Sequence, residues 1–382
     1  MPILLCYATP YCLIGVLYDE SLSPALRVKK IAKIKLPYPT FADNYPDVWD
    51  YVESELLYSL GLKKPMETVV VCNPSDFWYP QIKKRKNFKV VSSIDAFAEL
   101  NIPMIYLGEN RFYSVFGSLE FNINPGDVFR WFDFEESSSS IENFFQNRLL
   151  YGPSAAESSW ERAFENALIR EKMWLGFRNL PPTFLGKVEE IYLSGESLYG
   201  YSNLPELLLT FLDSVRTFGF WHLYFDEKSI LGPISGLCLR LATSDRSDGG
   251  QVRNKESVLE FLNEYPFRYI ADVFVVPAVP SAQVLFKDGK EQTLNLKREG
   301  IYVIPPIEGE EVTIRIKVQK RNFERKLSPS ELGVVFDTRK RPLVFSDVRS
   351  NRFAMRDNLR KQLSSWGEGK VKSQNLKVKS EG

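Results

Sequence analysis

Histidine and paired cysteines are scarce in this sequence. Its 382 residues include a single histidine and four cysteines, Cys6, Cys12, Cys72 and Cys238, with no C-x-x-C pair. Structural zinc sites draw on clustered cysteine and histidine ligands, so we expect no metal site and four reduced, buried thiols. The sequence does not decide whether Cys6 and Cys12 form a disulfide. The lone His222 lies in an alternating apolar run, where we expect a structural role, so no Ser-His-Asp triad can be proposed.

Long apolar runs are missing too. No run approaches the roughly 20 residues that a helix needs to cross a bilayer. The opening residues, MPILLCYATPYCLIGVLYD, lack a basic region and carry Pro2 and Pro10, which favours strand, turn and strand over a signal peptide. We therefore expect a cytoplasmic protein without membrane insertion.

Phosphate-binding and catalytic fingerprints are absent as well. Neither G-x-x-x-x-G-K nor G-x-G-x-x-G occurs in the chain. The segment GESLYG at 195–200 is one residue too long for a nucleophile elbow, so Ser197 is not expected at a strained turn. We expect the acidic pairs at 135–136 and 226–227 to lie in solvated turns. The sequence therefore offers no catalytic residue.

What is present is the composition of a soluble globular protein, with 44% hydrophobic and 25% charged residues. The length allows two domains and a small third. The net charge of +1 conceals a basic end, because twelve Lys and Arg stand against five Asp and Glu from residue 337 onward.

A strand, helix and strand between residues 190 and 237 form the clearest unit. An apolar run at 191–193 breaks into Ser194 and Gly195, Pro205 suits the first turn of a helix, and a second apolar run follows at 221–225. We expect the small residues at 232–236 to close the unit as a loop. Ligands tend to bind at the carboxyl end of such a first strand.

Two similar groups of elements precede this unit. We expect a first group of three strands, a helix and a strand, and a second group of hairpin strands followed by two helices. The first group covers 3–5, 13–18, 32–36, 46–60 and 68–72, and the second covers 103–107, 112–116, 118–123, 141–150 and 159–178. Their likeness is the nearest approach to an internal repeat.

The chain after residue 250 predicts short strands separated by prolines, which indicates a small all-β module. We expect five parts: a first lobe, a second lobe containing the central unit, the β module, a closing strand and helix, and a disordered basic tail. They cover 1–100, 101–250, 251–330, 331–366 and 367–382.

This order of elements resembles the actin-type nucleotide-binding architecture of sugar kinases and heat-shock chaperone ATPases. A closer resemblance is to the glutamate mutase L family, described as reactivating partners of a cobalamin-dependent mutase. It is carried by YLSGESLYGYSNLPELLLTFLDSV, GFWHLYFDEKSILGPISGL, GIYVIPPIEGEEVTI and LGVVFDTRKRPLVFSD, and the first half matches by element order alone. The resemblance implies an α/β, two-lobed actin-like (ribonuclease-H-like) ATPase fold with a small additional all-β module.

The resemblance also implies where a nucleotide cleft would lie, and the chain departs from the family there. Such ATPases use acidic, glycine-rich hairpins to hold phosphate and magnesium. Here the first hairpin, CYATPYCLIGV, has no acid or turn glycine, and Glu196 stands where the family has another glycine. The degenerate cleft positions are Thr9, Gly108, Glu109, Ser194 and Gly195.

We therefore predict a non-catalytic, actin-like scaffold or chaperone-like protein that binds a protein partner and needs no cofactor. ATP with magnesium, in an ATP-dependent reactivase of a cobalamin mutase, is the alternative. The sequence does not determine the oligomeric state.

The remaining candidates are surfaces for a partner. The segments FWYP at 77–80 and FRWFDF at 129–134 suggest exposed aromatic anchors, and arginines recur at helical spacing near the end of the chain. Nucleic-acid binding through that basic end is a weaker alternative, because it lacks paired aromatic platforms. The interaction candidates are Trp78, Tyr79, Trp131, Arg339, Arg341, Arg352 and Arg356.

Overall fold

A mixed sheet of five strands forms the first lobe. The structure, a computed structural model, describes residues 2–341 apart from 37–47, 64–65, 129–130, 132–136, 152–157, 182–184, 187, 200, 245–257, 278–280, 288, 290, 297–298, 306–310 and 319–320. The sheet order is β3-β2-β1-β4-β5, with β1 antiparallel to β2 and parallel to β4. The strands are β1 (Pro2–Ala8), β2 (Cys12–Asp19), β3 (Val28–Lys35), β4 (Thr68–Cys72) and β5 (Phe88–Ser92).

Three helices complete this lobe. The helices are α2 (Val48–Leu60), α3 (Tyr79–Lys83) and α4 (Ser93–Leu100), and a 3-10 turn, η1 (Pro24–Leu26), joins β2 to β3. Val52, Leu56 and Leu60 recur at helical spacing on α2 and are buried against the sheet. Of the elements in this lobe, the sequence predicted β1, β2, β3, α2 and β4.

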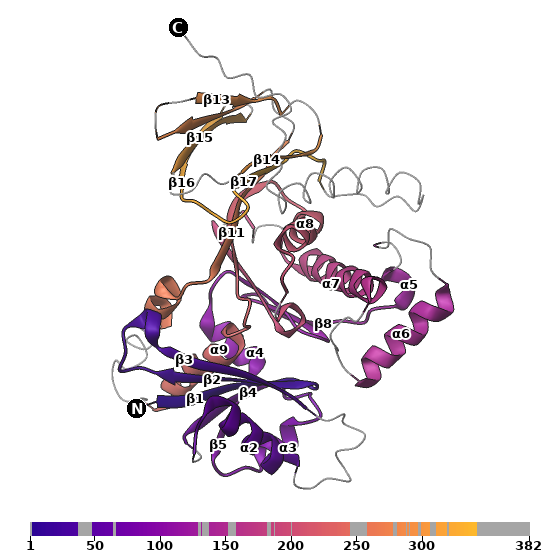
Figure 1. The fold of residues 1–382 in the computed structure, drawn as a ribbon, viewed down its shortest axis with the longest axis vertical. Helices are drawn as coiled ribbons and strands as arrows, with labels where there is room; N and C mark the ends of the chain where they lie inside the picture. The colour runs from indigo at the N-terminus through magenta and orange to yellow at the C-terminus, as the bar shows by residue number, and fades with distance from the viewer. Residues whose placement is uncertain are drawn as a thin grey trace.

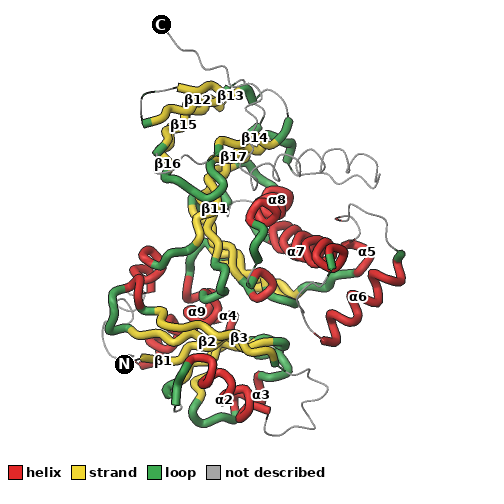
Figure 2. Tube along the Cα trace, viewed as in Figure 1, coloured by secondary structure: helices red, strands yellow, loops and turns green. Residues whose placement is uncertain are grey.

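The second sheet repeats the order of the first. Its order, β14-β17-β11-β10-β9-β6-β7-β8, contains β8-β7-β6-β9-β10, in which β6 is again antiparallel to one neighbour and parallel to the other. These strands are β6 (Met104–Leu107), β7 (Arg111–Ser114), β8 (Gly117–Glu120), β9 (Glu190–Ser194) and β10 (Gly219–Phe225). The repeated order confirms the expected two-lobed, actin-like α/β fold. Figure 2 shows the strands of both lobes in yellow.

The helices of the second lobe pack on this sheet and on one another. They are α5 (Pro125–Val128), α6 (Ser138–Tyr151), α7 (Ser159–Asn179) and α8 (Leu204–Ser214), and the 3-10 turn η3 (Glu196–Leu198) follows β9. A capping box between Ser158 and Glu161 fixes the start of α7. Asn203 caps α8, and Pro205 lies in its first turn, as the sequence predicted.

The lobes are joined by exchanged helices, which means helices of one lobe that pack against the other lobe, and not only by a connecting loop. Helix α9 (Leu231–Ser244) packs on β1 and β4 of the first lobe and against α4, and Figure 1 shows α4 and α9 between the two sheets. Our expectation of a loop at 232–236 is therefore wrong. The glycines there serve close packing, because a Cβ at Gly236 would lie 2.8 Å from a methyl group of Val71.

The expected β module is smaller than predicted. Four strands form a separate antiparallel sheet in the order β13-β12-β15-β16. They are β12 (Ala282–Phe286), β13 (Glu291–Leu294), β15 (Val312–Val318) and β16 (Arg321–Leu327), and β16 was not predicted. Three strands that we had placed in the module or the closing segment extend the second sheet instead: β11 (Arg268–Val275), β14 (Ile301–Ile304) and β17 (Val334–Asp337).

No helix in the described ranges is long and apolar enough to cross a bilayer. The closing helix and basic tail that we predicted lie outside the described residues. The domain boundaries drawn from the sequence stay predictions.

Candidate functional site

Three loops meet where the strands of the two lobes end, and the sequence singled out one or two residues in each. Thr9 lies in the β1–β2 turn, Gly108 and Glu109 in the β6–β7 turn, and Ser194 and Gly195 at the end of β9. The site therefore forms at the carboxyl edges of β1, β6 and β9, where α/β folds usually bind ligands.

The side chain of Glu196 lies at the centre of this edge. Its Oε1 atom accepts a hydrogen bond from the backbone amide of Glu109, with 2.9 Å between nitrogen and oxygen. Glu196 is 6% exposed, and a Cβ added at Gly108 would lie 2.9 Å from the same oxygen. A carboxylate of the chain itself therefore lies against the backbone of the β6–β7 turn.

Helix α7 contributes the cation of the site. The Nζ atom of Lys172 lies 3.0 Å from a carboxylate oxygen of Glu109 and donates to Ser197 Oγ at 3.0 Å. Ser197 Oγ in turn donates to the Gly108 carbonyl at 2.9 Å. Lys172 is 2% exposed, so its charge is matched by Glu109 inside the protein.

Gly195 allows the chain to turn close against β6 directly after β9. Its φ of +128° is one that residues with a side chain rarely adopt, and an added Cβ would lie 2.1 Å from the Leu107 carbonyl oxygen. The backbone of this loop therefore packs against strand β6 without space between them.

Ser194 and Asp226 connect the ends of β9 and β10 to helix α9. Ser194 Oγ donates to Asp226 at 2.7 Å, and the amides of Ile230 and Leu231 donate to the same carboxylate at 3.0 and 2.9 Å. Our expectation of a solvated turn is wrong for Asp226, which is 2% exposed because it caps the start of α9. Burial raises its pKa to about 6.

The polar groups of Thr9 form hydrogen bonds within its own hairpin. Its amide and hydroxyl both donate to the Cys12 carbonyl, at 2.9 and 3.2 Å, and its Oγ1 accepts from the Cys12 amide at 3.0 Å. Among the described residues, no group of three or more His, Cys, Asp or Glu side chains could hold a metal ion.

Aromatic side chains join the lobes beneath these loops. The ring of Tyr7 on β1 packs edge-on against Tyr106 on β6, with 5.3 Å between centroids, and Phe97 on α4 contacts both at 5.8 and 4.7 Å. Tyr113 lies 4.7 Å from Phe97, and its hydroxyl is 3.0 Å from Ser93 Oγ. The contact between the lobes beneath these loops is therefore packed core.

Two carboxyl groups near these rings have unusual proton affinities. Burial and the charge of Glu109 raise the pKa of Glu196 to about 7. Burial and the charge of Glu196 raise the pKa of Asp76, which follows β4 in the first lobe, to about 7. The site is therefore acidic overall, with more carboxyl groups than cations.

The prediction of exposed aromatic anchors is wrong for Trp78 and Trp131, whereas Phe77 is 40% exposed. Trp78 is fully buried and donates to the Pro10 carbonyl at 3.0 Å. Trp131 is 2% exposed and donates to Glu171 at 2.6 Å. Tyr79 is half-buried at the start of α3, with Lys83 over its ring. Each indole packs inward because its N–H finds a buried acceptor.

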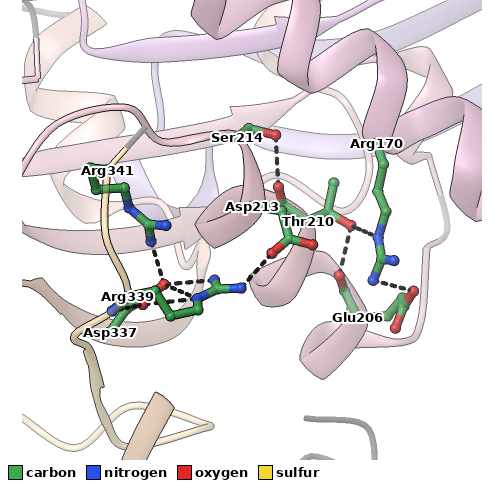
Figure 3. Close-up of polar contacts among 8 residues, drawn as sticks. All are labelled: Arg170, Glu206, Thr210, Asp213, Ser214, Asp337, Arg339 and Arg341. Carbon is green, nitrogen blue, oxygen red and sulfur yellow. Dashed lines mark hydrogen bonds and ion pairs between the residues drawn. The ribbon is translucent and has the colours of Figure 1, made fainter. Parts of the chain in front are cut away.

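Arg339 and Arg341, which we named as interaction candidates, are buried in ion pairs within the chain. Figure 3 shows both guanidinium groups on Asp337 at the end of β17. Arg339 also reaches Asp213 on α8 at 2.9 Å, and its side chain is 4% exposed. Asp337 and Asp213 raise the pKa of Arg339 against the opposing effect of burial. Arg352 and Arg356 lie outside the described residues.

Sequence reasoning missed the charged residues of α7. Arg170, Glu171 and Lys172 are consecutive and all buried, and each contacts a different part of the second lobe. Arg170 pairs with Glu206 on α8 at 2.7 Å, as Figure 3 shows, while Glu171 binds Trp131 and Lys172 binds Glu109. The sequence did contain a signal for their burial, because these three charged residues are flanked on both sides by apolar ones: Ala167, Leu168, Ile169, Met173 and Trp174.

Comparisons with known proteins return the fold alone. No protein-family model and no curated protein matches the sequence. The activator of 2-hydroxyisocaproyl-CoA dehydratase from Clostridium difficile with bound ADPNP has 8% identity and a TM-score of 0.37, over 70% of this chain and 98% of its own. The ethanolamine utilization protein EutJ from Carboxydothermus hydrogenoformans has 7% identity and a TM-score of 0.37, over 62% and 88%.

A third solved structure matches at a similar level. The ROK family glucokinase from Streptomyces griseus, in complex with glucose and AMPPNP, has 10% identity and a TM-score of 0.37, over 63% of this chain and 99% of its own. Because these scores are low, the fold assignment rests on the repeated sheet order. The resemblance to the glutamate mutase L family is not confirmed.

Proposed function

We propose that this protein is a non-catalytic, actin-like scaffold or chaperone-like protein in which a carboxylate of the chain takes the position of a bound phosphate. The observation that carries the proposal is the hydrogen bond from the Glu109 amide to Glu196. In a phosphate-binding turn such an amide would face the ligand. Here a negative side chain already accepts it.

The surroundings of Glu196 support the proposal. The loop at Gly195 packs on the backbone of Leu107, which leaves no room for a phosphate between them. The nearest cation, Lys172, is paired with Glu109. A triphosphate entering this edge would meet uncompensated carboxylates at low dielectric, where like charges repel strongly. These residues therefore do not suit a bound ATP.

Without phosphate chemistry, the architecture serves as a rigid body. The two lobes share one apolar cluster that contains Tyr7, Tyr106 and Ile234, and the ion pairs of Arg339 connect the end of β17 to α8. A body of fixed shape suits binding of a protein partner with little reorganisation. The identity of that partner and the binding surface stay open to experiment.

Phosphate release from millimolar ATP with magnesium tests the proposal. We expect no turnover from the wild type or from Glu196→Gln, which removes the charge and keeps the shape. Sustained turnover by the wild type would overturn the proposal and favour the ATP-dependent reactivase. Turnover by Glu196→Gln alone would show that only one charge excludes the nucleotide, and this would contradict the geometric argument at Gly195.

A further inference from the structure

Strand β10 has one covered face and one partly open face. Its side chains alternate between buried and half-buried, and the half-buried ones are Phe220, His222 and Tyr224. Glu190 of β9, which is exposed, is the register partner of His222 and therefore points to the same side of the sheet. Tyr269 of β11, which is half-buried, is the register partner of Tyr224. We call these five residues the His222 face.

Stacked tyrosine rings connect this face across three strands. The ring of Tyr224 stacks on Tyr192 of β9 and on Tyr269 of β11, with 5.0 and 4.9 Å between centroids. The Tyr192 hydroxyl donates to Glu190 at 3.3 Å, and the Tyr269 hydroxyl donates to Asp272. Packed rings with bonded hydroxyls give the face a fixed shape before any ligand binds.

The hydrogen bonds of His222 fix which ring nitrogen carries the proton. Its Nδ1 lies 2.6 Å from Oδ1 of Asp272 and 2.9 Å from the Tyr269 hydroxyl. Burial and the charge of Asp272 raise the pKa of Tyr269, so the phenol keeps its one proton and gives it to the carboxylate. Since neither neighbour can donate to Nδ1, this nitrogen is itself the donor, and Nε2 of the neutral ring is an acceptor.

Nε2 of His222 is available to a ligand. No residue in the described part of the chain forms a hydrogen bond with it, and the side chain is 24% exposed. Asp272, which is fully buried, orients the ring from behind. The His222 face therefore presents two acceptors on neighbouring strands, the imidazole nitrogen and the Glu190 carboxylate.

The His222 face carries negative charge that the cations bordering it do not match. Asp272 is buried, and its Oδ2 has no hydrogen-bond partner among the described residues. Glu190 adds a second carboxylate, which an uncharged phenol bonds. Arg268 and Arg325, which border the face, pair with glutamates outside it. A cationic ligand is therefore favoured here and an anionic one is repelled.

Arg325 of β16 indicates which kind of cation suits this surface. Its guanidinium carbon lies 6.0 Å from the centre of the Phe220 ring, and its Nη2 donates to Glu189 at 2.6 Å. A guanidinium group is planar and carries several N–H donors, so it can lie on a ring and bind a carboxylate at once. The His222 face offers the same combination again, with Tyr224 as the ring and Glu190 as the carboxylate.

We propose that the His222 face binds an arginine side chain of a protein partner, whose guanidinium group donates to the Glu190 carboxylate and to Nε2 of His222. The inference deepens the proposed function and rests on it, because it gives the scaffold a binding surface and states the chemistry of its partner. The argument for this occupant is charge complementarity. A lysine would bring a point charge without the planar fork of donors.

Nuclear magnetic resonance of the full chain with labelled histidine tests the proposal. Because His222 is the single histidine, every ring signal reports on this face. The probes are the blocked tripeptides glycyl-arginyl-glycine and glycyl-lysyl-glycine, at about pH 8, above the range in which histidine usually titrates. We expect a neutral ring protonated at Nδ1, a saturable shift with the arginine peptide, and weaker binding of the lysine peptide.

A matched pair of variants separates the site from general charge attraction. Glu190→Gln keeps the shape of the side chain and should weaken arginine binding about tenfold, as expected when a charge-assisted hydrogen bond is lost. Glu99→Gln, at an exposed position on α4, removes the same charge elsewhere and should bind as wild type. Unshifted ring signals of Glu190→Gln without peptide show that the fold is kept.

Several results would overturn the proposal. They are a wild-type ring signal that the arginine peptide does not shift, equal affinity for the two peptides, and equal affinity of Glu190→Gln and Glu99→Gln. A shift that depends on protein concentration alone would place a second copy on the face and would also overturn it. Each of these results leaves the proposed function standing, whereas nucleotide turnover would overturn that function and leave arginine binding unchanged.

Discussion

The carboxylate of Glu196 accepts the backbone N–H of Glu109 at 2.9 Å, and this bond joins the end of β9 to the β6–β7 turn. A donor that phosphate-binding folds direct at a ligand is satisfied here from within the chain. The surrounding buried charges, which begin on α7, hold that arrangement in place.

Replacing Lys172 with methionine should destabilise the protein strongly. The change leaves Glu109 buried beside Glu196 without its cation, and breaking a buried pair in this way costs about 3–5 kcal/mol. Chemical denaturation gives the free energy of unfolding. Lys340→Met is the control, because Lys340 is 87% exposed in its pair with Glu299 and should matter by less than about 1 kcal/mol. Equal losses in the two variants would contradict the buried pair.

Gly195 and Gly117 allow the cost of backbone strain to be separated from the cost of steric overlap. Their φ values are +128° and +124°, but an added Cβ at Gly195 meets Leu107, whereas at Gly117 it meets nothing within 4 Å. Gly117→Ala should cost about 1–3 kcal/mol through backbone strain. Gly195→Ala should cost about 1–3 kcal/mol more through overlap. Similar unfolding midpoints in denaturant would show that the loop can move away from β6.

Arg339 should be among the most sensitive residues of the chain. Arg339→Met removes the buried cation paired with Asp213 and leaves Asp337 with Arg341 alone, with an expected loss of about 3–5 kcal/mol. Arg315→Met removes an exposed pair with Glu324 and should cost less than about 1 kcal/mol. Urea unfolding of both variants measures the difference. A small loss of stability in Arg339→Met would mean that Asp213 and Asp337 become solvated in the variant.

Gly236 should control the packing of the lobes. Because a Cβ there would lie 2.8 Å from Val71 and 3.2 Å from Val69, Gly236→Val pushes α9 away from the first sheet. We expect a loss of about 1–3 kcal/mol and faster proteolysis between the lobes. Gly300→Ala, whose Cβ would have only an ordinary contact with the Tyr302 ring at 3.7 Å, should be neutral in the same digestion. Unchanged proteolysis of Gly236→Val would argue against the exchanged helix.

Local sequence patterns were sufficient to predict most elements of the fold. The strand at 68–72 and the helix begun by Pro205 were predicted because apolar periodicity and capping residues act over a few positions. Helix α9 was read as a loop because glycine and proline usually break helices. Its glycines are explained only by the sheet that lies against it, which the sequence does not reveal.

The candidate site was predicted in outline only. The turns at Gly108 and Gly195 were found because glycine marks close backbone approach. The sequence left open whether Arg339 and Arg341 are solvated or ion-paired within the chain, and it wrongly suggested that Trp78 is an exposed anchor. Their partners Asp213 and Pro10 come from distant parts of the chain. Contacts of that kind depend on the tertiary fold.

Calorimetric titration of the wild-type protein with Mg·ATP tests the central claim most directly. If Glu196 holds the position of a phosphate, millimolar nucleotide should give no heat of binding and no rise in the thermal midpoint. Binding in the micromolar range, with a midpoint that rises with nucleotide concentration, would contradict the account.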